Sequence, residues 1–163
     1  MTPTVLEASP AAQRTGRSPI STMRRASVVM CLALLVQYGL GIWVNLFVPA
    51  LPKPDHGASS AAAFGRAVAN GPVGLSIHAS LGLVLILVGL GLAIRAGRTR
   101  RWGLFALATL GFVALVGAAI SGARFVGTGQ NGASMGMAMA WALAFLAYLL
   151  IAILTLRERA VRG

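Results

Sequence analysis

Polar and apolar positions along this chain are grouped in long blocks. Four mostly apolar runs occupy approximately residues 27–48, 73–94, 102–122 and 134–156. A helix needs about 20 apolar residues to cross the hydrocarbon core of a bilayer, whereas the strands of a membrane barrel alternate in polarity over about ten residues. The pattern therefore predicts an all-α membrane protein, an antiparallel bundle of four transmembrane helices over residues 27–156.

The segments between the runs predict where the spans end. Pro49, Pro52 and Pro54 stop the first span, because proline lacks a backbone donor and clashes with the preceding turn. In the loop that follows, residues 61–70 are expected to form a short interfacial helix. The segment 95–101 suffices only for a tight connection. Residues 1–26 and 157–163 are predicted to be basic tails, the first of them disordered.

Composition supports a membrane environment. Hydrophobic residues make up 57% of the 163 residues and charged residues 10%, whereas an ordinary soluble domain is about 25% charged. The net charge of +11 does not indicate a nucleic-acid partner, because the basic residues lie between the apolar runs and do not form one soluble face. The expected partners are the lipid bilayer and either other membrane proteins or further copies of this chain.

The basic residues also predict the orientation of the bundle, since positive charge is retained on the cytoplasmic side. Only Lys53, Arg66 and Arg124 lie on the side of the two longer loops. We therefore predict cytoplasmic N- and C-termini and, because Ala, Gly and Arg are abundant, a bacterial cytoplasmic membrane. The basic residues on the side of the termini are Arg14, Arg17, Arg24, Arg25, Arg95, Arg98, Arg100, Arg101, Arg157, Arg159 and Arg162.

Polar side chains inside the spans indicate which helix faces point toward other helices, because an unpaired polar group in hydrocarbon is costly. On the first span Ala33, Gln37, Gly41 and Asn45 recur at every fourth position and lie on one stripe. We predict that this stripe faces the inside of the bundle. Gln37 and Asn45 are then expected to form interhelical hydrogen bonds, each worth about 0.6–2 kcal/mol.

His78 and three methionines lie near the outer end of the predicted bundle. His78 shares one face of the second span with glycines, so we expect its imidazole to point inward. Three roles stay open for it: a neutral hydrogen-bonded core residue, a cofactor or metal ligand, or a group that handles protons. The outer end of the fourth span carries three methionines, which are either packing residues or ligands. They are Met135, Met137 and Met139.

Catalytic groups are not found in the predicted spans. The acidic residues Glu7, Asp55 and Glu158 all lie in tails or loops. Membrane hydrolases and proton-coupled transporters typically need an intramembrane acid or a nucleophile with its base. We therefore predict no catalytic residue and no metal site. The tryptophans are interpreted as interfacial or packing residues.

The first span and its loop carry a family resemblance. Gln37, Gly41 and Val44 follow one another in the span, and Pro54 and Asp55 follow in the loop. This order is similar to one four-helix half of the haem A synthase type of membrane haem protein, in which a Gln, a Gly-x-x-Val-Arg motif and a Pro-Asp pair occupy these positions. The likeness extends over about residues 36–155.

His78 extends the resemblance to the second span. The family has Glu-x-x-His-Arg at the outer end of its second helix, and His78 takes the place of the histidine, with Leu75 and Ala79 in place of the Glu and Arg. Asn45 stands where the arginine of the first helix would be. The resemblance implies a haem b site with His78 as one axial ligand and, as the other, Met135, Met137 or Met139.

Three functions follow as hypotheses. The leading one is a non-enzymatic accessory or interaction subunit of a membrane assembly, because small residues line the helix faces and catalytic groups are not recognisable. The second is a haem b-binding membrane cytochrome with His78 as an axial ligand. The third is a transporter of a small neutral solute, which is less favoured because four spans leave little room for a pore.

Overall fold

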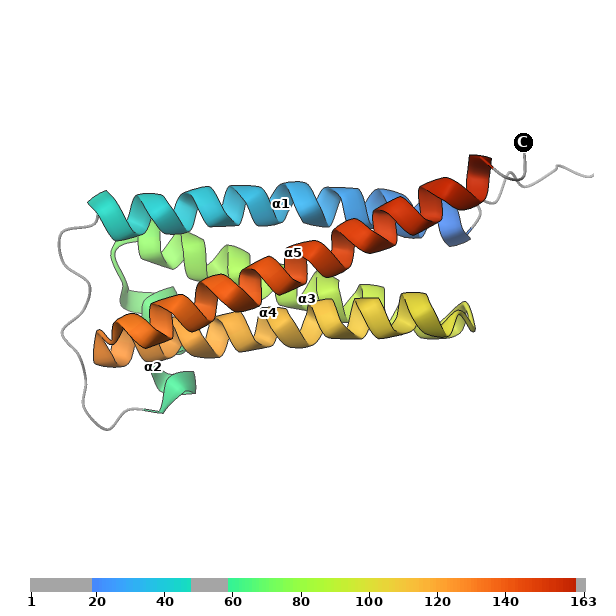
Figure 1. The fold of residues 1–163 in the computed structure, drawn as a ribbon. Helices are drawn as coiled ribbons and strands as arrows, with labels where there is room; N and C mark the ends of the chain where they lie inside the picture. Colours follow the sequence, from blue (N-terminus) through green and yellow to red (C-terminus); the bar gives the residue numbers. More distant parts are fainter. Residues whose placement is uncertain (1–18, 48–58, 161–163) are drawn as a thin grey trace, which may run out of the picture.

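The computed structural model describes residues 19–47 and 59–160. Four of the helices in these residues are long and apolar enough to cross a membrane, over Ile20–Phe47, Val73–Arg98, Trp102–Thr128 and Asn131–Leu156. This confirms the prediction of four long apolar helices in an all-α bundle. The helices, shown in Figure 1, are α1 (Pro19–Phe47), α2 (Ser60–Asn70), α3 (Val73–Arg98), α4 (Trp102–Thr128) and α5 (Asn131–Ala160).

The long helices extend beyond the apolar runs that predict them. Residues 19–26, part of the predicted disordered tail, belong to α1, and residues 157–160 of the second predicted tail belong to α5. Pro19 is compatible with this start because proline is tolerated in the first turn. The remaining tail residues, 1–18 and 161–163, and the loop residues 48–58, including the proline stops and Asp55, lie outside the described residues.

The connection between α4 and α5 is much shorter than the sequence predicts. Residues 123–128 and 131–133 are helical, so that only Gly129 and Gln130 separate the two helices. Gly129 adopts the left-handed conformation with φ of 67°, and its N–H donates to the carbonyl of Phe125 at 2.7 Å. Glycine is the usual residue for this type of helix ending because it has no Cβ.

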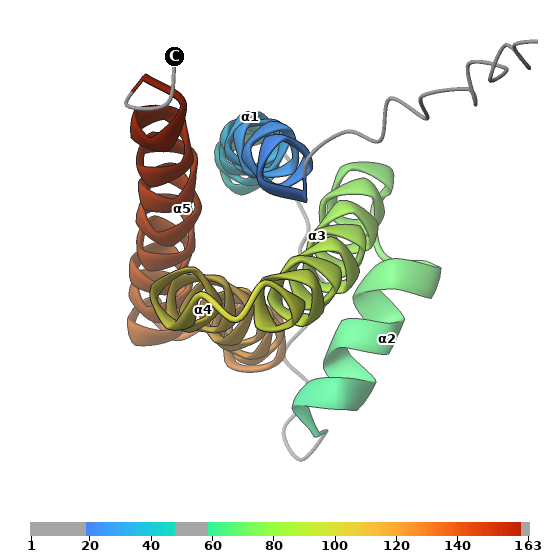
Figure 2. The same cartoon turned by 90° about the vertical axis from the view of Figure 1, so that its right-hand side faces the viewer.

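The four long helices form a ring when viewed along the bundle (Figure 2). α1 packs against α3 and α5, and α4 packs against the same two helices. α2 lies outside the ring, where it contacts α3 and α4. The end of α1, the start of α3, the end of α4 and the start of α5 lie together (Figure 1), and we call this the cavity end of the bundle.

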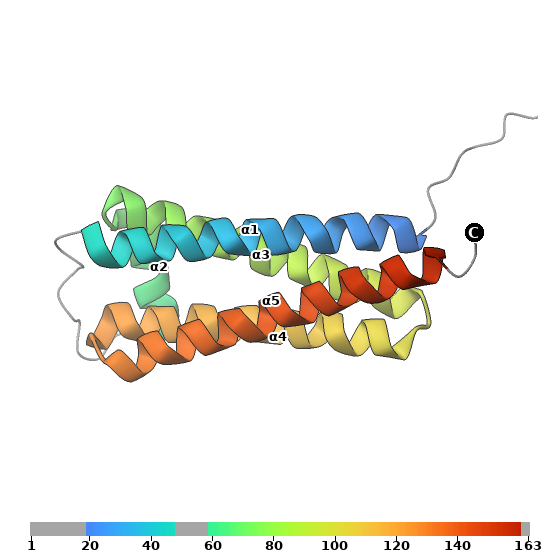
Figure 3. The same cartoon turned by 45° about the horizontal axis from the view of Figure 1, so that its top comes forward.

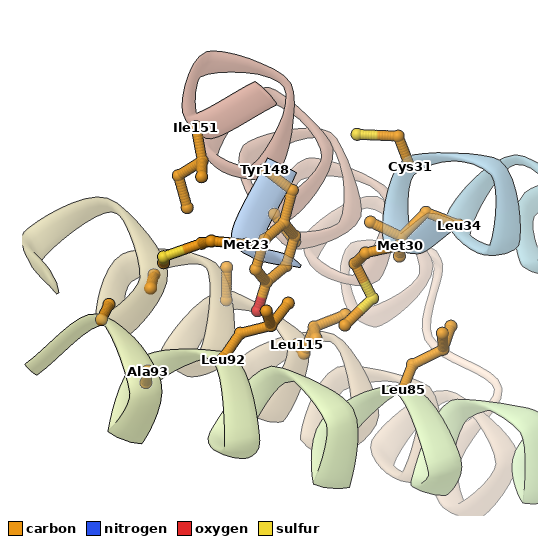
Figure 4. Close-up of a cluster of buried hydrophobic side chains, with 14 of the residues drawn as sticks. Met23, Met30, Cys31, Leu34, Leu85, Leu92, Ala93, Leu115, Tyr148 and Ile151 are labelled. Carbon is orange, nitrogen blue, oxygen red and sulfur yellow. The ribbon is translucent and has the colours of Figure 1, made fainter. Parts of the chain in front are cut away.

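A close-packed core fills the middle and the opposite half of the ring. Tyr148 is fully buried at its centre (Figure 4). Its ring lies in the space left by Gly111, and its hydroxyl lies in the space left by Gly89. Other buried members of this core are Met23, Met30, Cys31, Leu34, Leu85, Leu92, Ala93, Leu115 and Ile151.

The short helix α2 confirms the helix predicted in the first loop. Ser59 caps its start, because the hydroxyl accepts from the N–H of Ala62 at 3.2 Å. Ser76, on α3, donates to the carbonyls of Ala67 and Gly71, each at 3.0 Å. These carbonyls belong to the last turn of α2 and its C-cap, so one α3 side chain fixes the end of α2 against the bundle.

Candidate ligand-binding cavity

A cavity of about 250 Å³ lies inside the cavity end of the bundle, and all five helices contribute to its wall. Most of the wall is aliphatic or aromatic, and a few polar groups converge on it, which is the composition typical of small-molecule sites. The polar side chains in the wall include Gln37, Asn45, His78 and Ser134. Lysine, arginine, aspartate and glutamate are not among the described residues that line it.

His78 and Gln37 form the polar corner of this cavity, which we call the His78–Gln37 pair. The Gln37 side-chain nitrogen, Nε2, donates to the backbone carbonyl of His78 at 2.9 Å. The same nitrogen lies 3.5 Å from Nε2 of the His78 ring. One amide therefore contacts both the backbone and the ring of His78 and joins α1 to α3.

Two glycines make room for the His78–Gln37 pair. A Cβ on Gly41 would lie 2.9 Å from Cε1 of His78, and a Cβ on Gly82 would lie 3.2 Å from Nε2 of Gln37. Each glycine faces the polar side chain of the other helix, so the close approach is reciprocal. The small-residue faces predicted from the sequence thus accommodate the polar pair as well as helix packing.

The pair leaves two buried polar atoms without a hydrogen-bond partner among the described residues. These are Oε1 of Gln37 and Nδ1 of His78. Leaving such an atom unpaired in an apolar environment costs about 1–3 kcal/mol. Native structures rarely retain this cost without a structural or functional reason. Three hydroxyls elsewhere in the bundle, those of Ser27, Thr109 and Tyr148, are likewise buried without a hydrogen-bond partner among the described residues.

Trp141 of α5 holds one side of the cavity together. Its indole Nε1 donates to the backbone carbonyl of Leu34 at 2.9 Å, which joins α5 to α1. Its ring stacks on Tyr38 with a centroid distance of 4.5 Å and on Phe145 with a distance of 5.5 Å. The indole nitrogen is thus satisfied while its aromatic ring remains part of the cavity wall.

The exposed residues of the cavity wall lie on α1 and α5. The two helices lie close together at the far end of the bundle and diverge toward the cavity end (Figures 1 and 3). Wall residues on both sides of this gap are exposed: Tyr38 by 46%, Ile42 by 44%, and Ala138 on α5. In a bilayer these exposed side chains would face lipid.

The structure brings most of the sequence-predicted residues together. The cavity wall contains Gln37, Asn45, His78 and Met137, but Asn45 is at the same time an exposed residue. Gln37 forms the predicted interhelical hydrogen bond. Of the three methionines offered as alternative ligands, only Met137 lines the cavity. The other two, Met135 and Met139, are exposed by 65% and 66%.

Sequence reasoning missed the aromatic part of the wall. It treated Trp141 as a packing or interfacial residue and gave Tyr38 no role. A signal was present, because Trp141 follows Met137 by four residues and therefore shares its helix face. Tyr38 follows Leu34 at the same spacing. The helix periodicity could have assigned the Trp141 ring to the cavity once Met137 was placed there.

The described arrangement does not fit haem b on the ligands implied by the family resemblance. Nε2 of His78 faces the Gln37 amide, and the ring edge lies against Gly41. Of the three methionines only Met137 reaches the cavity. Haem b also carries two carboxylates, and the described lining offers no cation to pair with them.

Comparison with known proteins adds no assignment. No family model, no curated protein and no solved structure matches the chain. Within residues 19–47 and 59–160, no group of three or more His, Cys, Asp or Glu side chains is placed to hold a metal ion.

Proposed function

We propose that this protein is a multi-pass membrane protein that binds a small, uncharged, lipid-soluble ligand in the cavity between its helices. The four spans cross the bilayer antiparallel, with both termini in the cytoplasm of a bacterial cell. The excess of arginine on the side of the termini supports this orientation. The cavity end then lies in the outer half of the membrane.

The observation that carries this proposal is the cavity itself, an apolar space with one polar corner and an exposed side between two membrane helices. Its volume of about 250 Å³ is slightly below the usual range for small-molecule sites, roughly 300–1,000 Å³, so the ligand is small. A ligand dissolved in the bilayer would reach it through the gap between α1 and α5. An entry from water is not needed.

Binding without reaction is the best-supported activity. The lining contains His78 but no described acid, thiol or metal ligand beside it that would activate a nucleophile. The core around Tyr148 fills the remainder of the ring, which favours a closed site over a transport path. The accessory-subunit hypothesis concerns the outer surface and remains a prediction, compatible with a ligand site inside the bundle.

Quenching of tryptophan fluorescence tests the proposal. Bromobenzene is an apolar probe whose bromine quenches an indole that it contacts, and Trp141 lines the cavity. We expect saturable quenching in detergent-solubilised protein. Ala119→Phe fills the cavity from α4 and should abolish the saturable part, whereas Ala106→Phe adds the same ring to an exposed position of the same helix and should preserve it.

Two further outcomes contradict the proposal. Quenching that rises linearly with probe concentration in the wild type indicates only contact from the detergent. Saturable quenching that survives in Ala119→Phe places the probe elsewhere. Trp141→Phe identifies the reporter, because Trp43 and Trp102 then provide the only indole signal.

A further inference from the structure

We propose that the arginine-rich end of the bundle, opposite the cavity end, binds the phosphate headgroup of an anionic phospholipid. Four exposed arginines lie there: Arg25 on α1, Arg95 and Arg98 on α3, and Arg100 in the turn between α3 and α4. We call these four residues the basic surface. The cavity lies at the other end of the bundle (Figure 1), so the basic surface is independent of the ligand proposed above.

The start of α1 and the end of α3 come together at this end of the bundle (Figure 2). Met23 on α1 and Ala93 on α3 are buried members of the same apolar core (Figure 4). Arg25 follows Met23 by two residues, and Arg95 follows Ala93 by two residues. The arginines of α1 and α3 therefore surround the end of one core, and together they form a single positive surface.

The protein supplies little negative charge to balance these arginines. The chain contains 14 basic and 3 acidic residues. Helices α1 to α4 contain no aspartate or glutamate, and the only acidic residue of α5 is Glu158. Because like charges on one surface repel each other, binding of anions stabilises it. Most of the counter-ions of the basic surface must therefore come from outside the chain.

Apolar side chains beside the basic surface indicate that the bound anion is part of a lipid. Ile94, next to Arg95, is exposed by 51%, and Trp102, at the start of α4, is exposed by 80%. Tryptophan is enriched at the headgroup level of membranes, and arginine at that level attracts anionic lipids. A phospholipid fits both features, because its phosphate pairs with guanidinium groups and its chains cover the apolar side chains. A free phosphate ion fits only the first.

Arg100 occupies a backbone position that favours glycine. Its φ is 56°, and it is the only non-glycine residue with positive φ in the part of the chain that the structure describes. This left-handed conformation is sterically unfavourable for a residue with a Cβ, and glycine adopts it without strain. The turn thus holds a guanidinium group at the membrane surface where glycine would be less strained. This favours a role of the Arg100 charge in binding.

Native mass spectrometry of the full chain tests the proposal, with equal amounts of phosphatidylglycerol and phosphatidylcholine added to the detergent. Both lipids carry a phosphate, but only phosphatidylglycerol has a net negative headgroup. We expect the wild type to retain phosphatidylglycerol in preference to phosphatidylcholine. Replacing Arg95 and Arg98 together by glutamine should lower this preference about fivefold for each arginine removed. As a matched control, replacing Arg66 and Arg124 by glutamine removes the same charge from exposed positions of α2 and α4 and should leave the preference unchanged.

Arg100→Gly separates the loss of binding from a loss of fold. Because glycine relieves the strained backbone, we expect the midpoint of thermal unfolding in neutral detergent to stay the same or rise. The preference for phosphatidylglycerol should nevertheless fall about fivefold. A variant that is at least as stable as the wild type and binds the anionic lipid less well supports a site for lipid at this turn. An unchanged preference in Arg100→Gly contradicts it.

Three other results would overturn the proposal. Equal retention of the two lipids by the wild type means that the basic surface does not select an anionic headgroup. An equal loss of preference in the variant of Arg95 and Arg98 and in the control variant means that only the net charge of the protein matters. Inorganic phosphate that displaces phosphatidylglycerol more effectively than chloride at equal ionic strength identifies a site for the free ion.

Discussion

Tyr148 illustrates how single residues determine the packing of this bundle. The side chain is fully buried, and its phenol occupies the spaces that two glycines leave on the neighbouring helices. A Cβ on Gly89 would lie 2.7 Å from the Tyr148 hydroxyl oxygen and 3.0 Å from Cδ1 of Leu115. Gly91, on the same helix, has nothing within 4 Å of such a Cβ. Packing against Tyr148 therefore requires a glycine at position 89, whereas position 91 of the same helix has room for a side chain.

We predict that Gly89→Ala destabilises the protein by about 1–3 kcal/mol, because an added methyl group overpacks a filled core. Gly91→Ala is the matched control. It should be neutral or stabilise the protein by up to about 1 kcal/mol, through the higher helix propensity of alanine. Reversible unfolding in mixed detergent measures both changes. Equal effects of the two substitutions would show that Tyr148 moves aside without cost.

His78 provides a second prediction at the scale of the residue. Because its Nε2 faces the Gln37 amide, we expect protein expressed with ample haem and purified in mild detergent to show no Soret band. Absorption spectroscopy measures this directly. A stoichiometric band that disappears in His78→Ala would establish the haem b hypothesis and contradict the assignment of an uncharged ligand.

At the scale of the element, hydropathy predicted the four long helices because each must bury its own backbone hydrogen bonds in an apolar run. It placed their ends less well. Residues 123–128 and 131–133 continue the helices past the apolar segments, since a helix keeps its hydrogen bonds in the interface too. Hydropathy does not report this continuation. The sharp turn at Gly129 depends on one residue with positive φ.

Ser76 allows a test of how α2 is held. Its hydroxyl donates to the carbonyls of Ala67 and Gly71 at the end of α2. In Ser76→Ala we expect amide hydrogen exchange in the last turn of α2 to accelerate about three- to tenfold, which corresponds to the roughly 0.5–1.5 kcal/mol of a hydrogen bond. Exchange in α4 should not change. An unaltered rate in α2 would mean that its packing alone holds it.

At the scale of the whole molecule, the distribution of arginine predicts an orientation that labelling can test. In a Cys31→Ala background, Gln130→Cys lies in the turn between α4 and α5, and Thr99→Cys lies in the turn between α3 and α4. We expect a membrane-impermeant maleimide to label Gln130→Cys in intact cells and Thr99→Cys only after lysis. The reverse pattern would invert the proposed topology.

The candidate site shows which features of the whole molecule can be predicted from the sequence alone. The four-residue spacing on the first span predicted that Gln37 and Asn45 face inward; both line the cavity, but only Gln37 is partly buried and Asn45 is exposed. Helix periodicity gives this information because it depends on one helix alone. The contact of Gln37 with His78, and the exposure of Met135 and Met139, depend on how helices rotate against each other. Such rotations are set by packing across the ring, which no single span encodes.

On the proposed function, entry of the ligand between α1 and α5 determines which concentration matters to the site. A cavity that fills from the hydrocarbon region equilibrates with the mole fraction of ligand in the membrane, and not with its concentration in water. A molecule that partitions strongly into lipid reaches a high local concentration there. Modest intrinsic affinity is then enough for full occupancy, and occupancy would respond to changes in membrane composition that leave the aqueous phase unaltered.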